Sequence, residues 1–209
     1  MLRTFLQELP LIAILRGITP EEMPAAVDAL AAAGFGIIEV PLNSPRALES
    51  LRYLAGRAGD RLLAGAGTVL SVAELDVVAD AGVGLAVSPD CRPEVVAAAK
   101  RRGLAALPGV ATPSEAFAAL RAGADALKMF PAEVLPPAAL KAWRAVLPAG
   151  TPLIPVGGIG PDEMAGYLAA GAAGFGIGSA LYKPGLSGKE LGERARTFVE
   201  SYRRIVGKT

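Results

Sequence analysis

The 209-residue chain contains no histidine, and this absence excludes more chemistry than any other feature of its composition. Histidine is the commonest general base near neutral pH and the partner that activates most catalytic serines and many cysteines. It is also a frequent ligand of catalytic zinc. Proton transfer would therefore rely on Asp, Glu, Lys, Tyr or water, and we expect neither a histidine-bound metal nor a zinc-dependent carbon–carbon lyase.

Cysteine, excess charge and long apolar segments are also scarce. The single Cys91 excludes an internal disulfide, and although Arg92 could lower the pKa of its thiol, we interpret it as a small residue tolerated in a loop. The formal net charge is +1 and no basic block stands out, so we expect no nucleic-acid or membrane surface. Without a bilayer-spanning apolar run or a signal peptide, we expect a cytoplasmic protein.

Short apolar runs alternate with alanine-rich amphipathic stretches along the whole chain. The runs predict eight buried strands at residues 11–16, 36–40, 61–67, 84–89, 103–109, 124–130, 152–158 and 174–179. Eight such units without a long linker predict an α/β fold, a single (β/α)8 TIM barrel over residues 1–209. Residues 1–9 predict a leading helix at the bottom of the barrel. An open doubly wound sheet is the main rival, and the absence of distinct edge strands favours the barrel.

The helix signals are local and follow from capping chemistry. Several predicted helices, including those at 20–34 and 113–124, end at a glycine: Gly34, Gly103, Gly123 and Gly171. Thr112 precedes Pro113 and lies three residues before Glu115, which is typical of a helix N-terminus with a capping box.

Lys128 lies inside the apolar run at 124–130, where a lysine is unexpected. Burial disfavours the ammonium form and lowers the pKa, and a neutral amine can attack a ketone to form a Schiff base. A lysine that extends to water, or pairs with Glu39, would explain the residue without catalysis. Its position at a predicted strand end favours catalysis, because barrel active sites lie at the carboxyl ends of the strands.

Other polar residues end neighbouring strands. Glu39 is a candidate general base, because no histidine is available, or else an ion-pair partner of Arg16 or Lys128. Arg16 can bind carboxylates or phosphates, or pair with Glu39. Thr68 follows a Gly-Ala-Gly turn and can hold a carboxylate or cap the next helix.

Two glycine-rich loops follow the last two predicted strands. They are VGGIG at 156–160 and GIGSAL at 176–181, and Ser179 adds a hydroxyl to the second. Backbone amides in these loops are the usual phosphate site of a barrel, although a glycine alone often only makes a turn. Together the strand ends predict a site for a phosphorylated small molecule.

Taken together, these motifs resemble the class I, lysine-dependent aldolases that cleave 2-keto-3-deoxy-6-phospho sugar acids. The matching stretches cover essentially the whole chain: PLIAILRGITP (10–20), EVPLNSP (39–45), GAGTVL (65–70), SPD (88–90), PGVATPSEAF (108–117), ALKMFPAE (126–133), PVGGI (155–159) and GSALY (178–182). The resemblance implies a (β/α)8 barrel, a homotrimer, no metal and no cofactor. It implies pyruvate and glyceraldehyde 3-phosphate as the products of cleavage.

The resemblance also implies roles for individual residues. Lys128 would be the Schiff-base lysine and Glu39 the proton shuttle. Thr68 would hold the pyruvyl carboxylate, with Arg16 nearby. The remaining matches are Pro89 and Phe130 in the pyruvyl pocket, and Gly157, Gly158, Gly178 and Ser179 in the phosphate site.

Two positions separate branches of this family. The phosphogluconate branch carries arginine where this chain has Asn43, and threonine where it has Val156. The pattern here looks more like the phosphogalactonate branch, whose substrate differs at one hydroxyl. Valine cannot donate a hydrogen bond to that hydroxyl, whereas threonine can. Some members act on both epimers and on 4-hydroxy-2-oxoglutarate.

Two other functions would use similar loops. One is a barrel isomerase or decarboxylase in which Lys128 donates a proton and forms no covalent adduct. The other is a module that binds sugar phosphates without turnover. The presence of both Lys128 and Glu39 favours the aldolase.

Overall fold

The computed structural model describes residues 1–207. Its strands are β1 (Leu11–Ile14), β2 (Ile37–Pro41), β3 (Leu63–Gly67), β4 (Leu85–Val87), β5 (Ala105–Leu107), β6 (Gly109–Val110), β7 (Leu127–Met129), β8 (Leu153–Pro155) and β9 (Phe175–Ile177). Its helices are α1 (Leu2–Glu8), α2 (Met23–Ala33), α3 (Ala47–Gly56), α4 (Val72–Asp80), α5 (Pro93–Arg101), α6 (Pro113–Arg121), the short 3-10 helix η1 (Ala132–Val134), α7 (Pro137–Arg144), α8 (Met164–Ala169) and α9 (Gly188–Val206). Within residues 1–207, none of these helices is long and apolar enough to cross a membrane.

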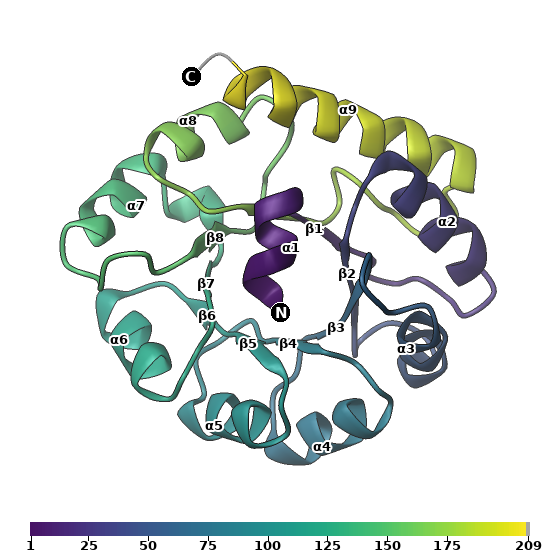
Figure 1. The fold of residues 1–209 in the computed structure, drawn as a ribbon, viewed down its shortest axis with the longest axis horizontal. Coiled ribbons are helices and arrows are strands. Elements are labelled where there is room, and N and C mark those ends of the chain that lie inside the picture. The colour runs from purple at the N-terminus through teal and green to yellow at the C-terminus, as the bar shows by residue number, and fades with distance from the viewer. Residues whose placement is uncertain (208–209) are drawn as a thin grey trace.

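The strands form two parallel sheets. One has the order β5-β4-β3-β2-β1-β9 and the other the order β6-β7-β8. Viewed down the short axis of the molecule, the strands surround α1, and helices α2 to α9 lie outside them (Figure 1). The protein therefore has an α/β fold whose parallel strands form at least a half-barrel, with the helices on its outer face.

The sheets adjoin at two places. Pro108 separates β5 from β6, so the strand predicted at 103–109 is in fact two strands that pair on different sides. Proline has no amide hydrogen for a strand ladder. Its carbonyl still accepts a hydrogen bond from the backbone amide of Lys128 at 2.9 Å. At the other junction, a single parallel bridge joins Val156, just after β8, to Gly176 in β9.

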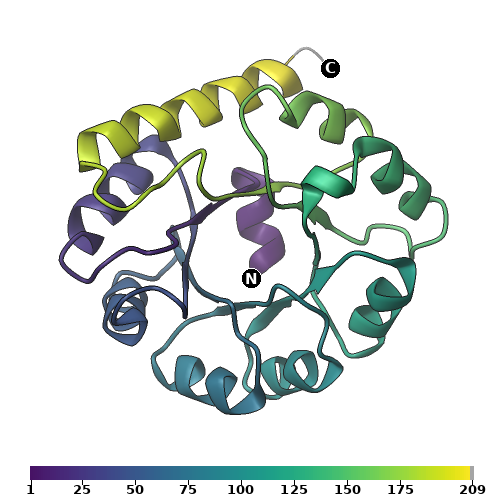
Figure 2. The same ribbon diagram turned by 180° about the vertical axis from the view of Figure 1, so that it is seen from behind.

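Helix α1 covers the end of the molecule where the strands begin. Leu2 and Phe5 are buried in the inner apolar cluster with residues of β1, β2, β3 and β4. The packing is close, because a Cβ added at Gly36, just before β2, would lie 3.1 Å from the Phe5 ring. The predicted leading helix is therefore confirmed, and the opposite end, seen in Figure 2, is where the strands finish.

Alternation along the strands decides which side chains face inward, because successive strand residues point to opposite faces. In β1, Ile12 and Ile14 belong to the inner apolar cluster, whereas Leu11 and Ala13 pack against the helices. The same alternation places Ile37 inside and Ile38 outside. It therefore directs the residue after Ile38, which is Glu39, toward the inside.

The helix ends follow the predicted capping chemistry. The four glycines expected to end helices all have positive φ, namely Gly34 (99°), Gly103 (76°), Gly123 (99°) and Gly171 (98°). The capping box of α6 is present, since Thr112 accepts from the Glu115 amide and the Glu115 carboxylate accepts from the Thr112 amide. These local predictions are confirmed.

Candidate active site

Among residues 1–207, Lys128 and Glu39 are the charged side chains buried on the inner face of the strands. Lys128 is the middle residue of β7, and its side chain is on the same face as Ala126 and Phe130, which pack in the inner cluster. Relative exposure is 4% for Lys128 and 1% for Glu39. The period-2 pattern therefore brings a lysine and a carboxylate from β7 and β2 into one interior.

The environment of Lys128 disfavours its ammonium form. Its Nζ lies 4.8 Å from the centre of the Phe130 ring, and among residues 1–207 no carboxylate oxygen lies within 4.0 Å of it. Burial lowers the pKa of Lys128, the Glu39 charge partly opposes that shift, and Arg16 adds to it. A lowered pKa leaves more of the lysine as the neutral amine, which is the form that attacks a carbonyl.

Glu39 is buried in the same interior as Lys128 and has an unsatisfied oxygen. Its Oε2 is buried and has no hydrogen-bond partner among the described residues. Burial raises the pKa of Glu39, while the positive charges of Lys128 and Arg16 oppose that rise. Glycine is required beside it, because a Cβ at Gly67 would lie 2.8 Å from Oε1. A carboxyl group that is not committed to a structural bond can exchange protons with a bound molecule.

A cavity of about 420 Å³ opens above these residues at the carboxyl ends of the strands. Its lining includes eight of the residues predicted from sequence: Arg16, Lys128, Phe130, Val156, Gly157, Gly158, Gly178 and Ser179. Lys128 and residues of both glycine-rich loops therefore line one cavity. Glu39, Asn43, Thr68 and Pro89 are not part of that lining.

Asn43 contacts the site through Arg16. The Arg16 Nη1 donates a hydrogen bond to Asn43 Oδ1 at 2.7 Å, and the Gly17 amide donates to Ser44 Oγ at 2.9 Å. The loop after β2 therefore fixes the loop after β1. In the structure, the partner of Arg16 is Asn43 and not Glu39, so the predicted alternative of an Arg16–Glu39 ion pair is wrong.

Thr68 and Pro89 lie at neighbouring strand ends. Thr68 directly follows Gly67, which contacts Glu39, and its backbone is left-handed with φ of 58°. Such a conformation is unusual for a β-branched residue and is found mostly at functional sites. Pro89 packs against Gly109, where an added Cβ would lie 2.2 Å from the Pro89 carbonyl oxygen, and Gly109 is in register with Lys128.

The cavity also includes residues that carried no predicted role. They are Ile14, Glu133, Ile159, Ala180, Tyr182, Lys183 and Pro184. Glu133 packs on the first glycine loop, because a Cβ at Gly157 would lie 2.3 Å from its Oε2. Both Glu133 and Tyr182 end stretches that identified the family motifs, and Lys183 follows directly. The available signal was a polar residue at the end of each motif, followed in the second case by Lys183.

The predicted effect of Arg92 on Cys91 is not found. Burial raises the pKa of the Cys91 thiol, and Glu115, Asp90 and Glu94 raise it further. Arg92 pairs instead with Asp90 at 2.9 Å. The thiol therefore stays protonated, which agrees with the interpretation of Cys91 as a tolerated small residue. Among residues 1–207, there is no cluster of three or more His, Cys, Asp or Glu side chains that could hold a metal.

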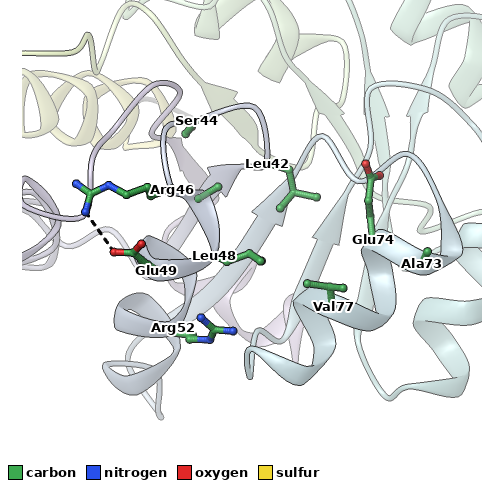
Figure 3. A pocket seen from close by; sticks show the side chains of 10 residues that line it. Leu42, Ser44, Arg46, Leu48, Glu49, Arg52, Ala73, Glu74 and Val77 are labelled. Atoms are coloured by element: carbon green, nitrogen blue, oxygen red, sulfur yellow. Dashed lines mark hydrogen bonds and ion pairs between the residues drawn. The ribbon is translucent and has the colours of Figure 1, made fainter.

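A larger hollow of about 730 Å³ lies on the outer surface between α3 and α4. Figure 3 shows apolar side chains that line it, among them Leu42, Leu48 and Val77, while Arg46 and Glu49 pair with each other. Lys128 and Glu39 do not line it, and neither do the glycine-rich loops. Although this groove is larger, the candidate active site is the smaller cavity, because Lys128 and the glycine-rich loops line that cavity.

Comparison with known proteins finds relatives that match nearly the whole chain. The profile described as "KDPG and KHG aldolase" matches residues 2–193. The 2-dehydro-3-deoxy-6-phosphogalactonate aldolase of Escherichia coli strain K12 is 46% identical over 199 residues, which cover 95% of this chain and 97% of the relative. A solved structure described as native KDPGal matches with a TM-score of 0.94 at 46% identity, over 96% of this chain and 97% of that one.

A third relative bears on the chemistry. The KDPG aldolase of Legionella pneumophila, solved with pyruvate captured at low pH as a covalent carbinolamine intermediate, matches with a TM-score of 0.82. It is 29% identical and covers 95% of this chain and 98% of that one. The family resemblance predicted from the motifs is confirmed: this chain belongs to the KDPG and KHG aldolase family and is a carbon–carbon lyase.

Proposed function

We propose that the protein is a Schiff-base aldolase that reversibly cleaves 2-keto-3-deoxy-6-phosphogalactonate to pyruvate and glyceraldehyde 3-phosphate, with Lys128 as nucleophile and Glu39 as proton shuttle. The observation that carries this proposal is the buried Lys128, whose pKa is lowered, with the unpartnered Glu39 oxygen in the same interior. The covalent pyruvate adduct of the Legionella relative supports the same chemistry.

The reaction begins when the neutral Lys128 amine attacks the C2 ketone to give a carbinolamine. Glu39 donates a proton to the departing hydroxyl, water leaves, and an iminium remains. The Glu39 carboxylate then removes the proton of the C4 hydroxyl. The C3–C4 electron pair moves into the iminium, which releases glyceraldehyde 3-phosphate and leaves an enamine. Protonation at C3 and hydrolysis then release pyruvate and the free amine.

The other predicted residues would bind the substrate around these two groups. Thr68 would hold the pyruvyl carboxylate, with the Arg16 guanidinium nearby to add charge. Pro89 and Phe130 would shape the pyruvyl pocket. The phosphate would lie against Gly157, Gly158, Gly178 and Ser179, where backbone amides and a hydroxyl can donate hydrogen bonds.

Thr68→Gly tests the role of Thr68. A left-handed backbone costs a β-branched residue about 1–2 kcal/mol, and glycine removes that cost but loses more chain entropy. The free energy of unfolding should therefore change by less than about 1 kcal/mol, whereas the KM for the keto acid should rise about tenfold without the hydroxyl. Steady-state kinetics and thermal denaturation measure both. Thr68→Ser is the control that keeps the hydroxyl, and a wild-type KM in the glycine variant would refute this role.

The galactonate epimer is proposed from Asn43 and Val156. Val156 is 6% exposed and lines the cavity, so it presents only methyl groups to a substrate hydroxyl. The side-chain oxygen of Asn43 already accepts a hydrogen bond from Arg16. The 46% identity to the E. coli phosphogalactonate aldolase, against 29% to the Legionella KDPG aldolase, favours the same epimer. The gluconate epimer and 4-hydroxy-2-oxoglutarate are the alternative substrates.

The wider architecture is proposed on the same grounds. The adjoining ends at Pro108 and the Val156–Gly176 bridge support one closed (β/α)8 barrel formed by a single domain. The family resemblance supports a homotrimer, which light scattering would test against three times the 21.3 kDa chain mass. A cytoplasmic location stays a prediction, testable by fractionation of the source cells.

The experiment that tests the function is reductive trapping. The protein is incubated with pyruvate and borohydride, and the modified peptide is located by mass spectrometry. A reduced pyruvyl adduct on Lys128 alone is expected, together with faster cleavage of the galactonate than the gluconate epimer. Folded protein without an adduct would favour the isomerase, decarboxylase or binding-module alternatives, and faster cleavage of the gluconate epimer would reverse the substrate assignment.

A further inference from the structure

The cavity has an uneven distribution of charge. Among the described residues that line it, the cations are Arg16, Lys128 and Lys183, and the one carboxylate is Glu133. Lys128 lies at the buried end, whereas Lys183 is exposed at the mouth, on the same loop as Ser179. In the part of the chain that the structure describes, Lys183 forms no side-chain hydrogen bond or ion pair. Its charge is therefore available to a ligand.

The loop that carries Lys183 is fixed by contacts that do not involve its ammonium group. The half-buried Glu22 carboxylate accepts a hydrogen bond from the Gly185 amide at 3.0 Å and another from the Thr19 amide at 2.9 Å. Pro184 packs on Gly17, where an added Cβ would lie 2.9 Å from the proline ring. These contacts join the loop after β9 to the loop after β1.

Both neighbours of Lys183 are therefore restrained. Tyr182, on its other side, is buried and donates its amide to the Gly178 carbonyl at 3.0 Å. A cation on a fixed backbone loses less freedom on binding than one on a mobile loop. The loop thus holds an unpaired positive charge on a restrained backbone, in the cavity that Ser179 also lines.

We propose that Lys183 binds the phosphate group of the substrate and, with Ser179 and the glycine-rich loops, determines the preference for phosphorylated over phosphate-free keto acids. This inference rests on the proposed function and names a residue that the family motifs do not assign. A phosphate carries close to two negative charges at neutral pH, and backbone amides alone leave that charge uncompensated. Glu133 beside Gly157 would repel it further, so a nearby cation is needed.

Lys183 acts on binding and not on the nucleophile. Burial, Glu39 and Arg16 set the pKa of Lys128. A neutral side chain at position 183 therefore leaves the reactivity of the amine as it is. Loss of the charge should appear in the affinity for phosphorylated ligands.

The test compares Lys183→Met with wild type, with Lys183→Arg, and with Lys189→Met as a matched control at an exposed lysine outside the cavity. The first measurement is the Kd of glycerol 3-phosphate by calorimetry, which needs no turnover. The second is the ratio of kcat/KM for 2-keto-3-deoxy-6-phosphogalactonate to that for its phosphate-free analogue. In Lys183→Met, the Kd of glycerol 3-phosphate should rise about tenfold, and the ratio of kcat/KM values should fall about tenfold. Added salt should reduce the difference in Kd between this variant and wild type, because it screens the lysine charge.

The outcomes separate this inference from the proposed function. Lys183→Arg should retain most of the affinity, and Lys189→Met should match wild type. Equal Kd values in all four proteins, or an equal loss for phosphorylated and phosphate-free substrates, would overturn the role of Lys183. If no keto acid is cleaved by wild type but glycerol 3-phosphate binding still depends on Lys183, the anion site stands and the aldolase function fails.

Discussion

Lys128→Met should lower kcat by a factor on the order of 10⁴ or more, because it removes the buried amine that forms the iminium and so accepts the C3–C4 electron pair. Methionine has nearly the length of lysine and fills the same space without the amine. Borohydride trapping with pyruvate should yield no adduct in this variant. Single-turnover kinetics and intact-mass measurement check the two effects separately.

The same substitution should stabilise the fold. Burial lowers the pKa of Lys128 in the native state below its ordinary value of 10.5. The unfolded chain therefore binds this proton more tightly, and the free energy of unfolding falls as the pH drops from 10.5 toward the native pKa. Lys128→Met removes that dependence, and replacing a buried charge by an apolar group of similar size often adds about 1–2 kcal/mol at neutral pH. Denaturant titrations across this pH range measure the effect.

Lys141→Met is the matched control, because Lys141 is an exposed lysine on α7. It should retain wild-type turnover and the wild-type pyruvate adduct. If Lys128→Met keeps more than about a tenth of the wild-type kcat, the assignment of Lys128 as nucleophile is wrong. If it loses activity and stability together, the lysine is better explained as part of the core.

The order of strands and helices could be predicted from sequence because burial leaves a strong pattern. The run at 124–130 is apolar except at Asp125 and Lys128, and β7 (Leu127–Met129) lies within it. The boundaries were less predictable, since β7 ends at Met129 and α2 begins only at Met23. Strand ends depend on which amides find partners across the sheet, and that pairing is not local in the sequence.

The division of the predicted strand at 103–109 also depends on strand pairing that is not local in the sequence. Pro108 was visible in the sequence, but its effect depends on which neighbours β5 and β6 find. A proline can end a strand, start one or sit at an edge. Only the paired registers, with Leu107 beside Val87 and Gly109 beside Lys128, show that the chain changes partners at this residue.

The site was predictable where chemistry and strand position coincide. Lys128 and Glu39 stood out because a charge in a buried strand is rare. Lys183 was not predicted, because an exposed lysine in a loop has no unusual feature in sequence. Its significance comes from the Glu22 contact to Gly185, which joins residues 163 positions apart. Such a contact is a property of the folded loops and not of a motif.

Glu39→Gln should lower kcat by about 10²–10⁴, because the proton of the C4 hydroxyl loses its acceptor. Glutamine keeps the shape of the side chain beside Gly67, so the pocket should be preserved. The amine of Lys128 is still present, and some pyruvate adduct should still be trapped by borohydride. The variant therefore separates carbon–carbon cleavage from formation of the Schiff base.

The pH dependence of trapping gives an independent measure of the same pair. The negative charge of Glu39 raises the pKa of Lys128, against the larger lowering caused by burial. Removing that charge should lower the pKa of Lys128 further, so a larger fraction of the amine is neutral at a given pH. The pH at which adduct formation is half-maximal should therefore move down in Glu39→Gln, even though overall turnover is slower.

Stability supplies the control on folding. Burial raises the pKa of Glu39 in the native state above its ordinary value of 4.5. Its contribution to the free energy of unfolding is therefore complete below pH 4.5 and is lost as the pH rises through the native pKa. Glutamine has no such loss, and Glu39→Gln should be at least as stable as wild type at neutral pH. Glu193→Gln, at an exposed carboxylate on α9, should change neither rate nor pH profile. Unchanged cleavage rates in Glu39→Gln would exclude Glu39 as the shuttle, and an unmoved trapping profile would show that its charge does not act on Lys128.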